Sequence, residues 1–337
     1  MNNQDTLIDR VLQNLLKEQA EKGPDLRQQH PKSHGLLHGE FKVRDDIPKQ
    51  YKVGVFAKPH TYSIWIRFSN GSSPKARGCL QPDTEGDSRG MAIKLMEVPG
   101  DKILDDEKFT QDFILINHPV FFLPDVQGYI DLITFRKQKE QGNPEPELQK
   151  KLERTLAISE EIKAKIVGNP LLIQYWSTTP YTLGDVPIKF LVKPYKLEEP
   201  PAAKPDSPNY LREAIVKYFN DTEESVKFDF QIQVYVDDDK TPIENPMVEW
   251  KEADSPPITV AMIEIPKQAF DFEERKRYDD SLSFSPWHTL PEHEPLGRVN
   301  LARKKIYEEG AKHRRDYIQE LLREPKPYLL IQDDPDN

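Results

Sequence analysis

The sequence predicts an α+β fold in which an antiparallel β-barrel, or a strongly bent sheet, is wrapped by helices and long loops. Six or seven short β-rich runs spread over the 337 residues are the first observation behind this prediction. A helical insertion divides these runs into two groups, and a long helical stretch follows the last of them. Strands in this number, interrupted once by helices, are typical of barrels and bent sheets.

The amino-terminal half begins with a helix and continues with strands. Apolar residues recur at helical spacing from Leu7 to Leu16 and predict a helix over residues 5–21, which ends near Gly23 and Pro24. Alternating or β-rich runs then predict strands over 36–43, 62–68, 91–96 and 113–116.

The rest of the chain mixes helices with further strands. Two helices are predicted over about 125–141 and 147–166, followed by strands at 188–192, 226–236 and 258–265 and by a helix over 208–219. A last helix is predicted from about Asn300, as its N-cap after Gly297, to about Leu322. We expect an N-terminal helix in residues 1–24, one domain over 25–325 and a tail over 326–337.

Composition narrows the class of protein. The net charge of −10 argues against nucleic acid and anionic membrane as partners, because phosphate binding requires a basic surface. The one cysteine, Cys79, excludes an internal disulfide framework and a multi-cysteine zinc site. The sequence has no apolar run of membrane-spanning length and no signal-peptide core at its start. We therefore expect a cytoplasmic protein without an integral membrane segment.

The C-terminal helix carries the first candidate site. Arg303, Tyr307, Ala311 and Arg314 share one helical stripe, on which Ala311 leaves room for a flat ligand. A free tyrosine is only ~0.1% ionised at pH 7, so a phenolate costs about 4 kcal/mol. A guanidinium one turn away and ligation of Fe(III) can offset this cost, and tyrosine is a known axial ligand of heme iron. The alternative is an ordinary surface contact between Arg303 and Tyr307.

Three histidines near the amino end have a misleading spacing. His30, His34 and His38 would form a zinc-binding stripe on a helix. Pro31, Gly35 and Gly39 interrupt any such helix, however, and the run that follows is a predicted strand. His30 instead is a candidate acid/base, with a structural histidine as the alternative.

Five sequence blocks in order resemble the heme catalase superfamily. RQQHPKSHG with Phe41 is similar to the segment of the distal histidine, and RFS at 67–69 followed by DSRGMAIK at 87–94 is similar to two further family patterns. NHPVFF at 117–122 resembles a fourth block, and Phe284-Ser-Pro286 with Arg303, Tyr307, His313 and Arg314 resembles the proximal segment. Together the blocks span residues 27 to 314. The resemblance implies a catalase-like barrel core with a helical insertion and a C-terminal proximal helix.

The resemblance also implies a set of site residues. Tyr307 is expected to be the iron ligand of a heme b and Arg303 to keep it ionised. His30 is expected to be the acid/base, Ser69 to hydrogen-bond its other nitrogen, and Asn117 to hydrogen-bond the peroxide. The heme propionates are expected to pair with Arg27, Arg67 and Arg314, whose forked guanidinium groups suit carboxylates. Phe122 is expected to form part of the dry distal wall.

Some features depart from full-size catalases. Gln29 stands before His30 where these enzymes carry a small apolar residue. We expect the protein to lack their C-terminal extension, so a nicotinamide-nucleotide site is not assumed. The segment 283–304 is more similar to the short branch of the superfamily, which contains minicatalases and allene oxide synthases. His288 and His293 in this segment are expected to be hydrogen-bonding residues of a loop.

Three functions follow from the resemblance. The first is a heme oxidoreductase that decomposes hydrogen peroxide or small hydroperoxides, as a catalase or a peroxidase. The second is an isomerase or lyase that acts on fatty-acid hydroperoxides, and the third is a heme-binding or sensing protein with little turnover. The sequence leaves the electron donor and the oligomeric state open, with a homo-oligomer as one option.

Overall fold

An antiparallel barrel forms the centre of the computed structural model, which describes residues 3–203, 205–319 and 323–328. Its strands follow the order β5-β4-β3-β2-β1-β9-β8-β7-β6. The strands are β1 (Ser33–Val43), β2 (Thr61–Asn70), β3 (Arg89–Leu95), β4 (Gln111–Ile116), β5 (Tyr175–Trp176), β6 (Tyr181–Leu183), β7 (Val186–Pro194), β8 (Val226–Val234) and β9 (Ile258–Ile265).

Strand β5 closes the barrel. Trp176 pairs with Ile116 of β4, and Tyr175 pairs with Val192 of β7, so that the two ends of the sheet meet. The eight strands of the ring are β1–β5 and β7–β9, while β6 forms a hairpin with β7. The antiparallel barrel predicted from the sequence is thereby confirmed.

The barrel interior is apolar because every second residue of each strand points inward. Aromatic rings fill its centre, with centroids 4.8 Å apart between Phe113 and Phe230 and 5.1 Å apart between Phe41 and Phe230. Full burial of such a side chain contributes roughly 1.5–3 kcal/mol to stability. The interior is therefore a packed core, and the polar residues of β1–β4 are left for the outer face.

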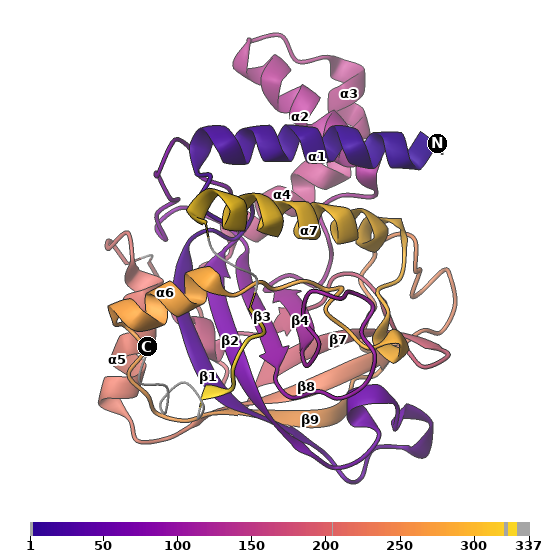
Figure 1. Cartoon of the computed structure of the whole chain (residues 1–337). Helices are drawn as coiled ribbons and strands as arrows, with labels where there is room; N and C mark the ends of the chain where they lie inside the picture. Colours follow the sequence, from indigo (N-terminus) through magenta and orange to yellow (C-terminus); the bar gives the residue numbers. More distant parts are fainter. Residues whose placement is uncertain (1–2, 204, 320–322, 329–337) are drawn as a thin grey trace.

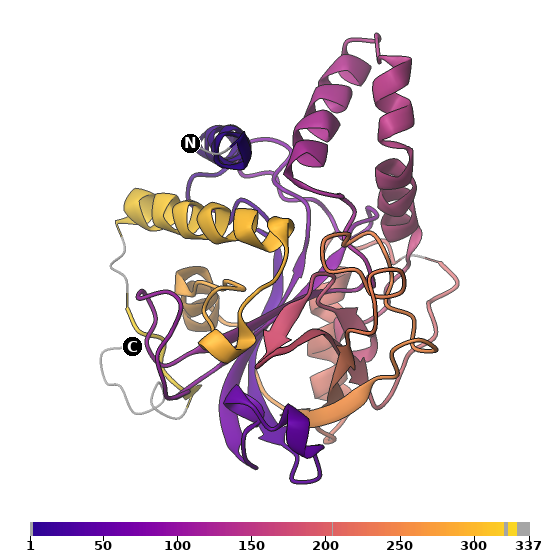
Figure 2. The same ribbon diagram turned by 90° about the vertical axis from the view of Figure 1, so that its right-hand side faces the viewer.

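Helices cover the outer face of β1–β4 (Figure 1). In front of this wall lie α6 (Glu273–Ser281) and α7 (Arg298–Ile318). Helix α1 (Asn3–Lys22) lies against α7 on the side away from the barrel, and it is seen end-on in Figure 2. Its apolar side chains Ile8, Val11 and Leu15 pack with Ala302 of α7.

The remaining helices lie outside this layer. Helix α2 (Val126–Glu140) and the pair α3 (Pro146–Lys151) and α4 (Glu153–Ala164) form a helical hairpin that projects from the barrel (Figure 2). Helix α5 (Tyr210–Asp221) packs against β1. None of the helices in the described part of the chain combines the length and apolar character needed to span a bilayer.

Two details of the predicted helices were wrong. Helix α7 begins at Arg298 with Gly297 as its N-cap, whereas Asn300 lies inside the first turn, where its side chain binds the carbonyl groups of Pro180 and Leu296. The helix predicted over 147–166 is broken at Leu152. The predicted end of the last helix, and most of the predicted tail, lie outside the described residues, and the division into residues 1–24, 25–325 and 326–337 stays a prediction.

Candidate active site

A cavity lies between the outer face of β2–β4 and helix α7. It contains about 800 Å³ of empty space. Strand residues, helix residues and two connecting segments contribute to its wall: Arg27, Gln28, Gln29, His30, Arg67, Ser69, Gly90, Met91, Ala92, Ile114, Leu115, Ser283, Phe284, Ile306, Tyr307, Gly310, Ala311 and Arg314. Residues almost 290 positions apart in the sequence thus meet at one cavity.

His30 projects from the segment before β1 onto the barrel wall. Its backbone has a φ of 57°, in the left-handed region that few residues other than glycine adopt, and its N–H donates to the Gly71 carbonyl. Gly90 makes room for the ring, because a Cβ atom at this position would lie 2.5 Å from Nδ1 of His30. The chain therefore holds His30 in a costly conformation at one fixed place.

The environment of His30 favours a neutral imidazole. Its Nδ1 lies 2.9 Å from the hydroxyl of Ser69. Burial, followed by the nearby charges of Arg67, Arg303 and Arg27, lowers the pKa of His30 to about 3. A neutral ring at pH 7 can accept a proton, and Ser69 fixes its orientation.

Tyr307 faces the cavity from α7 with Arg303 beside it. The guanidinium of Arg303 donates to the Tyr307 hydroxyl at 3.3 Å and to the Thr179 hydroxyl and the Asn300 side-chain oxygen at 3.1 and 3.0 Å. Burial alone would lower the pKa of Arg303, but Tyr307 and Tyr181 raise it. A permanently charged donor is therefore fixed next to the phenol oxygen. Thr179 and Asn300, which support Arg303, were not identified from the sequence because neither belongs to a recognisable motif.

Three arginines give the cavity an excess of positive charge. Arg67 donates to the buried carboxylate of Asp279 at 2.6 Å, and Arg27 lies 3.7 Å from the same carboxylate. Arg314 contacts the carbonyl of Leu282, while burial and then the charge of Arg67 lower the pKa of Arg314 to about 10. This buried carboxylate and the exposed carboxylate of Asp280, which lies 4.0 Å from Arg27, are too few to balance three guanidinium groups. The remaining positive charge suits an anionic ligand.

Three predicted residues are not among those that line the cavity, namely Asn117, Phe122 and Arg303. Asn117 is buried, and its side-chain oxygen accepts a hydrogen bond from the Arg89 backbone N–H at 2.7 Å. Phe122 is half-buried and packs in the clusters under the helical hairpin, next to Phe121. Of the nine predicted site residues, the structure places His30, Ser69, Tyr307, Arg27, Arg67 and Arg314 around one cavity, with Arg303 adjacent.

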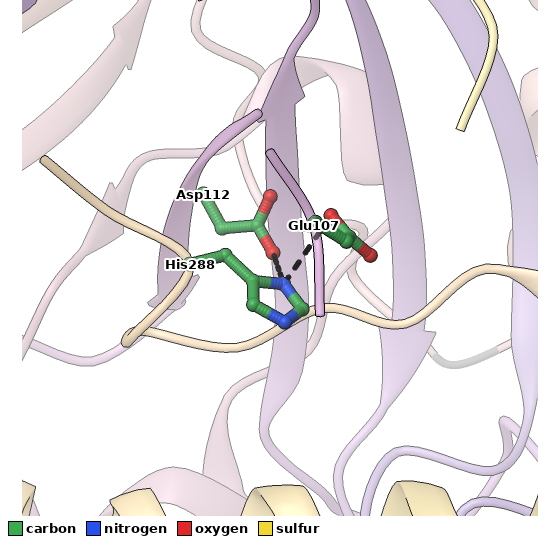
Figure 3. A group of neighbouring side chains, drawn as sticks. All are labelled: Glu107, Asp112 and His288. Atoms are coloured by element: carbon green, nitrogen blue, oxygen red, sulfur yellow. Dashed lines mark hydrogen bonds and ion pairs between the residues drawn. The ribbon is translucent and has the colours of Figure 1, made fainter. Parts of the chain in front are cut away.

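A buried polar cluster behind the cavity was also not predicted from the sequence. Glu107, Asp112 and His288 lie close enough to resemble a metal site (Figure 3). The ammonium group of Lys94 is hydrogen-bonded to Glu107 and lies 2.7 Å from Asp112, so the cluster already contains a cation. His288 is 2.9 Å from Asp112. Although burial favours the neutral ring, the charges of Glu107 and the neighbouring aspartates raise the pKa of His288 to about 10.

This cluster fixes one wall of the cavity. The backbone N–H of Ser285 donates to Asp112, and Lys94 lies 5.4 Å from the centre of the Phe284 ring. Phe284 and Ser283 line the cavity. His288 is thus a hydrogen-bonding residue of a loop, as expected from the sequence, and His293 accepts from the Val55 N–H at 3.0 Å.

The cavity fits a flat anionic group such as heme. Gly90 and Ala92 on the barrel wall, together with Gly310 and Ala311 on the helix, leave its opposite sides free of long side chains. Nε of Arg314 and Nε2 of Gln28 are buried without a hydrogen-bond partner. Buried donors without partners are uncommon in folded proteins, and these two belong to residues that line the cavity, although others such as Arg89 Nε and Gln174 Nε2 lie elsewhere.

The barrel, the crossing helix and the cavity between them define a catalase-type fold. The structure is similar to a fungal catalase at 18% identity over 86% of this chain and 59% of that chain, with a TM-score of 0.64. A bacterial catalase is 18% identical over 90% of this chain and 60% of that chain, with a TM-score of 0.64. Catalase A from Saccharomyces cerevisiae is 17% identical over 86% of this chain and 61% of that chain, with a TM-score of 0.64.

The sequence supports the same assignment. Residues 4–153 match the family model of catalase, whereas no curated protein matches the chain by sequence. The chain is therefore similar to catalases in sequence over residues 4–153 and in fold over most of its length. The chain spans about three fifths of the length of the solved catalases it resembles.

Proposed function

We propose that this protein is a heme-dependent oxidoreductase that decomposes peroxides, by a catalase or a peroxidase reaction. The observation that carries the proposal is the meeting of three groups at one cavity: a neutral histidine with a serine partner, a tyrosine with an arginine donor, and an excess of arginine charge. Fold similarity alone would support the architecture and not the chemistry.

Two of these groups, the tyrosine with its arginine donor and the three further arginines, would hold heme b. Tyr307 would supply an oxygen ligand to the iron, and the charged Arg303 donor lies 3.3 Å from that oxygen. Arg27, Arg67 and Arg314 are proposed to pair with the propionates, since forked guanidinium groups bind carboxylates well. The heme supplies the redox-active ferric iron that cleavage of an O–O bond requires.

His30 is the proposed acid/base. It accepts the proton of one peroxide oxygen and returns it to the other, which makes the second oxygen a good leaving group. Proton transfer of this kind contributes about 10²–10⁴-fold to a rate. Ser69 holds the ring in orientation, and Gly90 allows the ring to lie on the wall. Asn117 is the proposed peroxide-binding residue, and this role requires its side chain to break the hydrogen bond with the Arg89 backbone N–H.

A second candidate is rearrangement of fatty-acid hydroperoxides on the same scaffold. The observation that favours it is the apolar part of the cavity wall, to which Ile114, Leu115 and Ile306 contribute. This reaction would use the same His30 and Tyr307, but it would release no oxygen.

The test is to incubate the heme-loaded protein separately with hydrogen peroxide and with a polyunsaturated fatty-acid hydroperoxide. Oxygen evolution, or oxidation of an added donor, from the first supports the proposal. Conversion of the fatty-acid hydroperoxide without release of oxygen and without an added donor supports the second candidate. His30→Ala should abolish either activity while heme binding is kept, with His60→Ala, at an exposed position, as the matched control. No turnover of either substrate by the loaded protein would overturn the proposal in favour of a heme-binding or sensing role.

A further inference from the structure

The register of β2, β3 and β4 decides which side chains surround His30. Ser69 pairs with Gly90, and Gly90 pairs with Ile116. Directly opposed residues of antiparallel strands point to the same face of the sheet. Ser69, Gly90 and Ile116 therefore form one row on the outer face, and the His30 ring lies over the glycine in the middle of this row.

The next row on this face is also largely apolar. Arg67 pairs with Ala92, and Ala92 pairs with Ile114. The guanidinium of Arg67 is directed to Asp279 and to the carbonyl of His30. Ala92 and Ile114 line the cavity. Ile116 lies two residues further along β4, on the same face, and is half-buried.

Asn117 belongs to the opposite face. It follows Ile116 by one residue, and a shift of one residue in a strand moves a side chain to the other side of the sheet. Its backbone and side chain both bind Arg89, which pairs with Asn70, so these three residues form a separate row. The β4 residue that pairs with Gly90 on this face is therefore Ile116, and the carboxamide of Asn117 lies on the other face.

We propose that Ile116 sets the substrate class of this site and that the site favours organic hydroperoxides over hydrogen peroxide. This inference rests on the proposed function. Hydrogen peroxide presents a polar O–H at each end, and an O–H group that loses water without gaining a partner is costly. An alkyl hydroperoxide has one O–H, which His30 can bind, and its carbon substituent packs against Ile114 and Ile116.

The reaction balances with an external donor. The alkyl hydroperoxide, two electrons and two protons give the alcohol and water, with cleavage of the O–O bond. His30 carries the proton from the terminal oxygen to the alkyl-bearing oxygen. The two electrons come from a phenolic one-electron donor, for which guaiacol serves in the assay.

The experiment compares heme-loaded wild type, Ile116→Asn and Ile116→Ala. Ile116→Asn adds an amide to the row, whereas Ile116→Ala enlarges the space without adding a polar group. The ratio of kcat/KM for cumene hydroperoxide to kcat/KM for hydrogen peroxide is measured with guaiacol. We expect wild type to favour cumene hydroperoxide and Ile116→Asn to lower the ratio by at least about tenfold, while Ile116→Ala changes it less.

Binding of cumyl alcohol, the redox-inert product, gives a readout that needs no turnover. Calorimetry should show binding to wild type with a negative heat-capacity change, and Ile116→Asn should weaken it by about tenfold. A wild-type preference for hydrogen peroxide, or equal effects of the two substitutions, would overturn the inference and leave the proposed function intact. A protein that takes up no hemin would instead remove the proposed function. Should Ile116→Asn fail to fold, the wild-type ratio and the alcohol titration still decide the question.

Discussion

At the scale of single residues, Arg303 and Tyr307 combine a pattern visible in the sequence with a contact that only the fold creates. Their spacing of four predicts that the two side chains meet on a helix, and they do so at 3.3 Å. What the spacing did not reveal is the support of Arg303 by Thr179, which lies 124 residues away, and by Asn300, whose side chain is itself hydrogen-bonded to Thr179.

Asn117 illustrates the opposite case. The sequence block identified the right stretch of chain, but the face on which a residue lies depends on strand register and on where the strand ends. Strand β4 ends at Ile116, and Asn117 turns to the backbone of Arg89. A motif without its register therefore could not reveal that the Asn117 side chain binds the backbone of Arg89.

Replacement of the proposed ligand should change the bound heme. Tyr307→Phe removes the hydroxyl oxygen that is the proposed ligand and that accepts the Arg303 hydrogen bond. We therefore expect hemin affinity to fall more than about tenfold and the spectrum of any bound heme to change. Tyr317→Phe, at an exposed position of the same helix, is the control. An unchanged titration and spectrum for Tyr307→Phe would contradict the assignment of the ligand.

At the scale of elements, the strands were predicted well because period-two apolar patterns and β-branched residues are local signals. The strand predicted at 258–265 has the observed bounds of β9. Strands β5 and β6 and helix α6 were not predicted. The two strands have only two and three residues, and helix α6 has a polar sequence without an apolar stripe. The two-residue strand β5 closes the barrel. A closed barrel could be expected from the number of strands, but the position of the closing strand could not be found in the sequence.

The small residues of α7 lead to a prediction at this scale. Ala311→Leu places extra carbon atoms in the cavity opposite the barrel wall, and overpacking of this kind costs about 1–3 kcal/mol. Hemin affinity should therefore fall by roughly one order of magnitude while the fold is kept. Lys312→Leu makes the next residue of the helix equally large and apolar but lies on the exposed side. Equal hemin titrations for the two variants would show that the ligand does not contact this part of α7.

At the scale of the whole molecule, a buried charge network joins the barrel to the segment that precedes α7. Lys94 and Asp112 come from β3 and β4, while His288 comes from the loop, and all three are buried. Nothing in the sequence alone marks this network, because its members are 18 to 194 residues apart.

The network predicts how stability depends on pH. The folded pKa of His288, about 10, lies above its ordinary value of 6.5, so its stabilising contribution is complete below about pH 6.5 and is lost as pH rises toward 10. Removal of one partner from a buried charge network costs about 3 kcal/mol or more. Denaturant unfolding should show His288→Gln to be destabilised by about this amount at pH 6 and by clearly less at pH 10. A constant difference across this range would mean that His288 is neutral in the folded protein.

An absorption titration of the purified protein with hemin, beside Tyr307→Phe, tests the cofactor and its ligand together. We expect saturable uptake of one heme per chain, with a ferric spectrum typical of phenolate ligation that Tyr307→Phe loses. Absence of uptake, or a spectrum that is the same with and without the Tyr307 hydroxyl, would contradict this expectation.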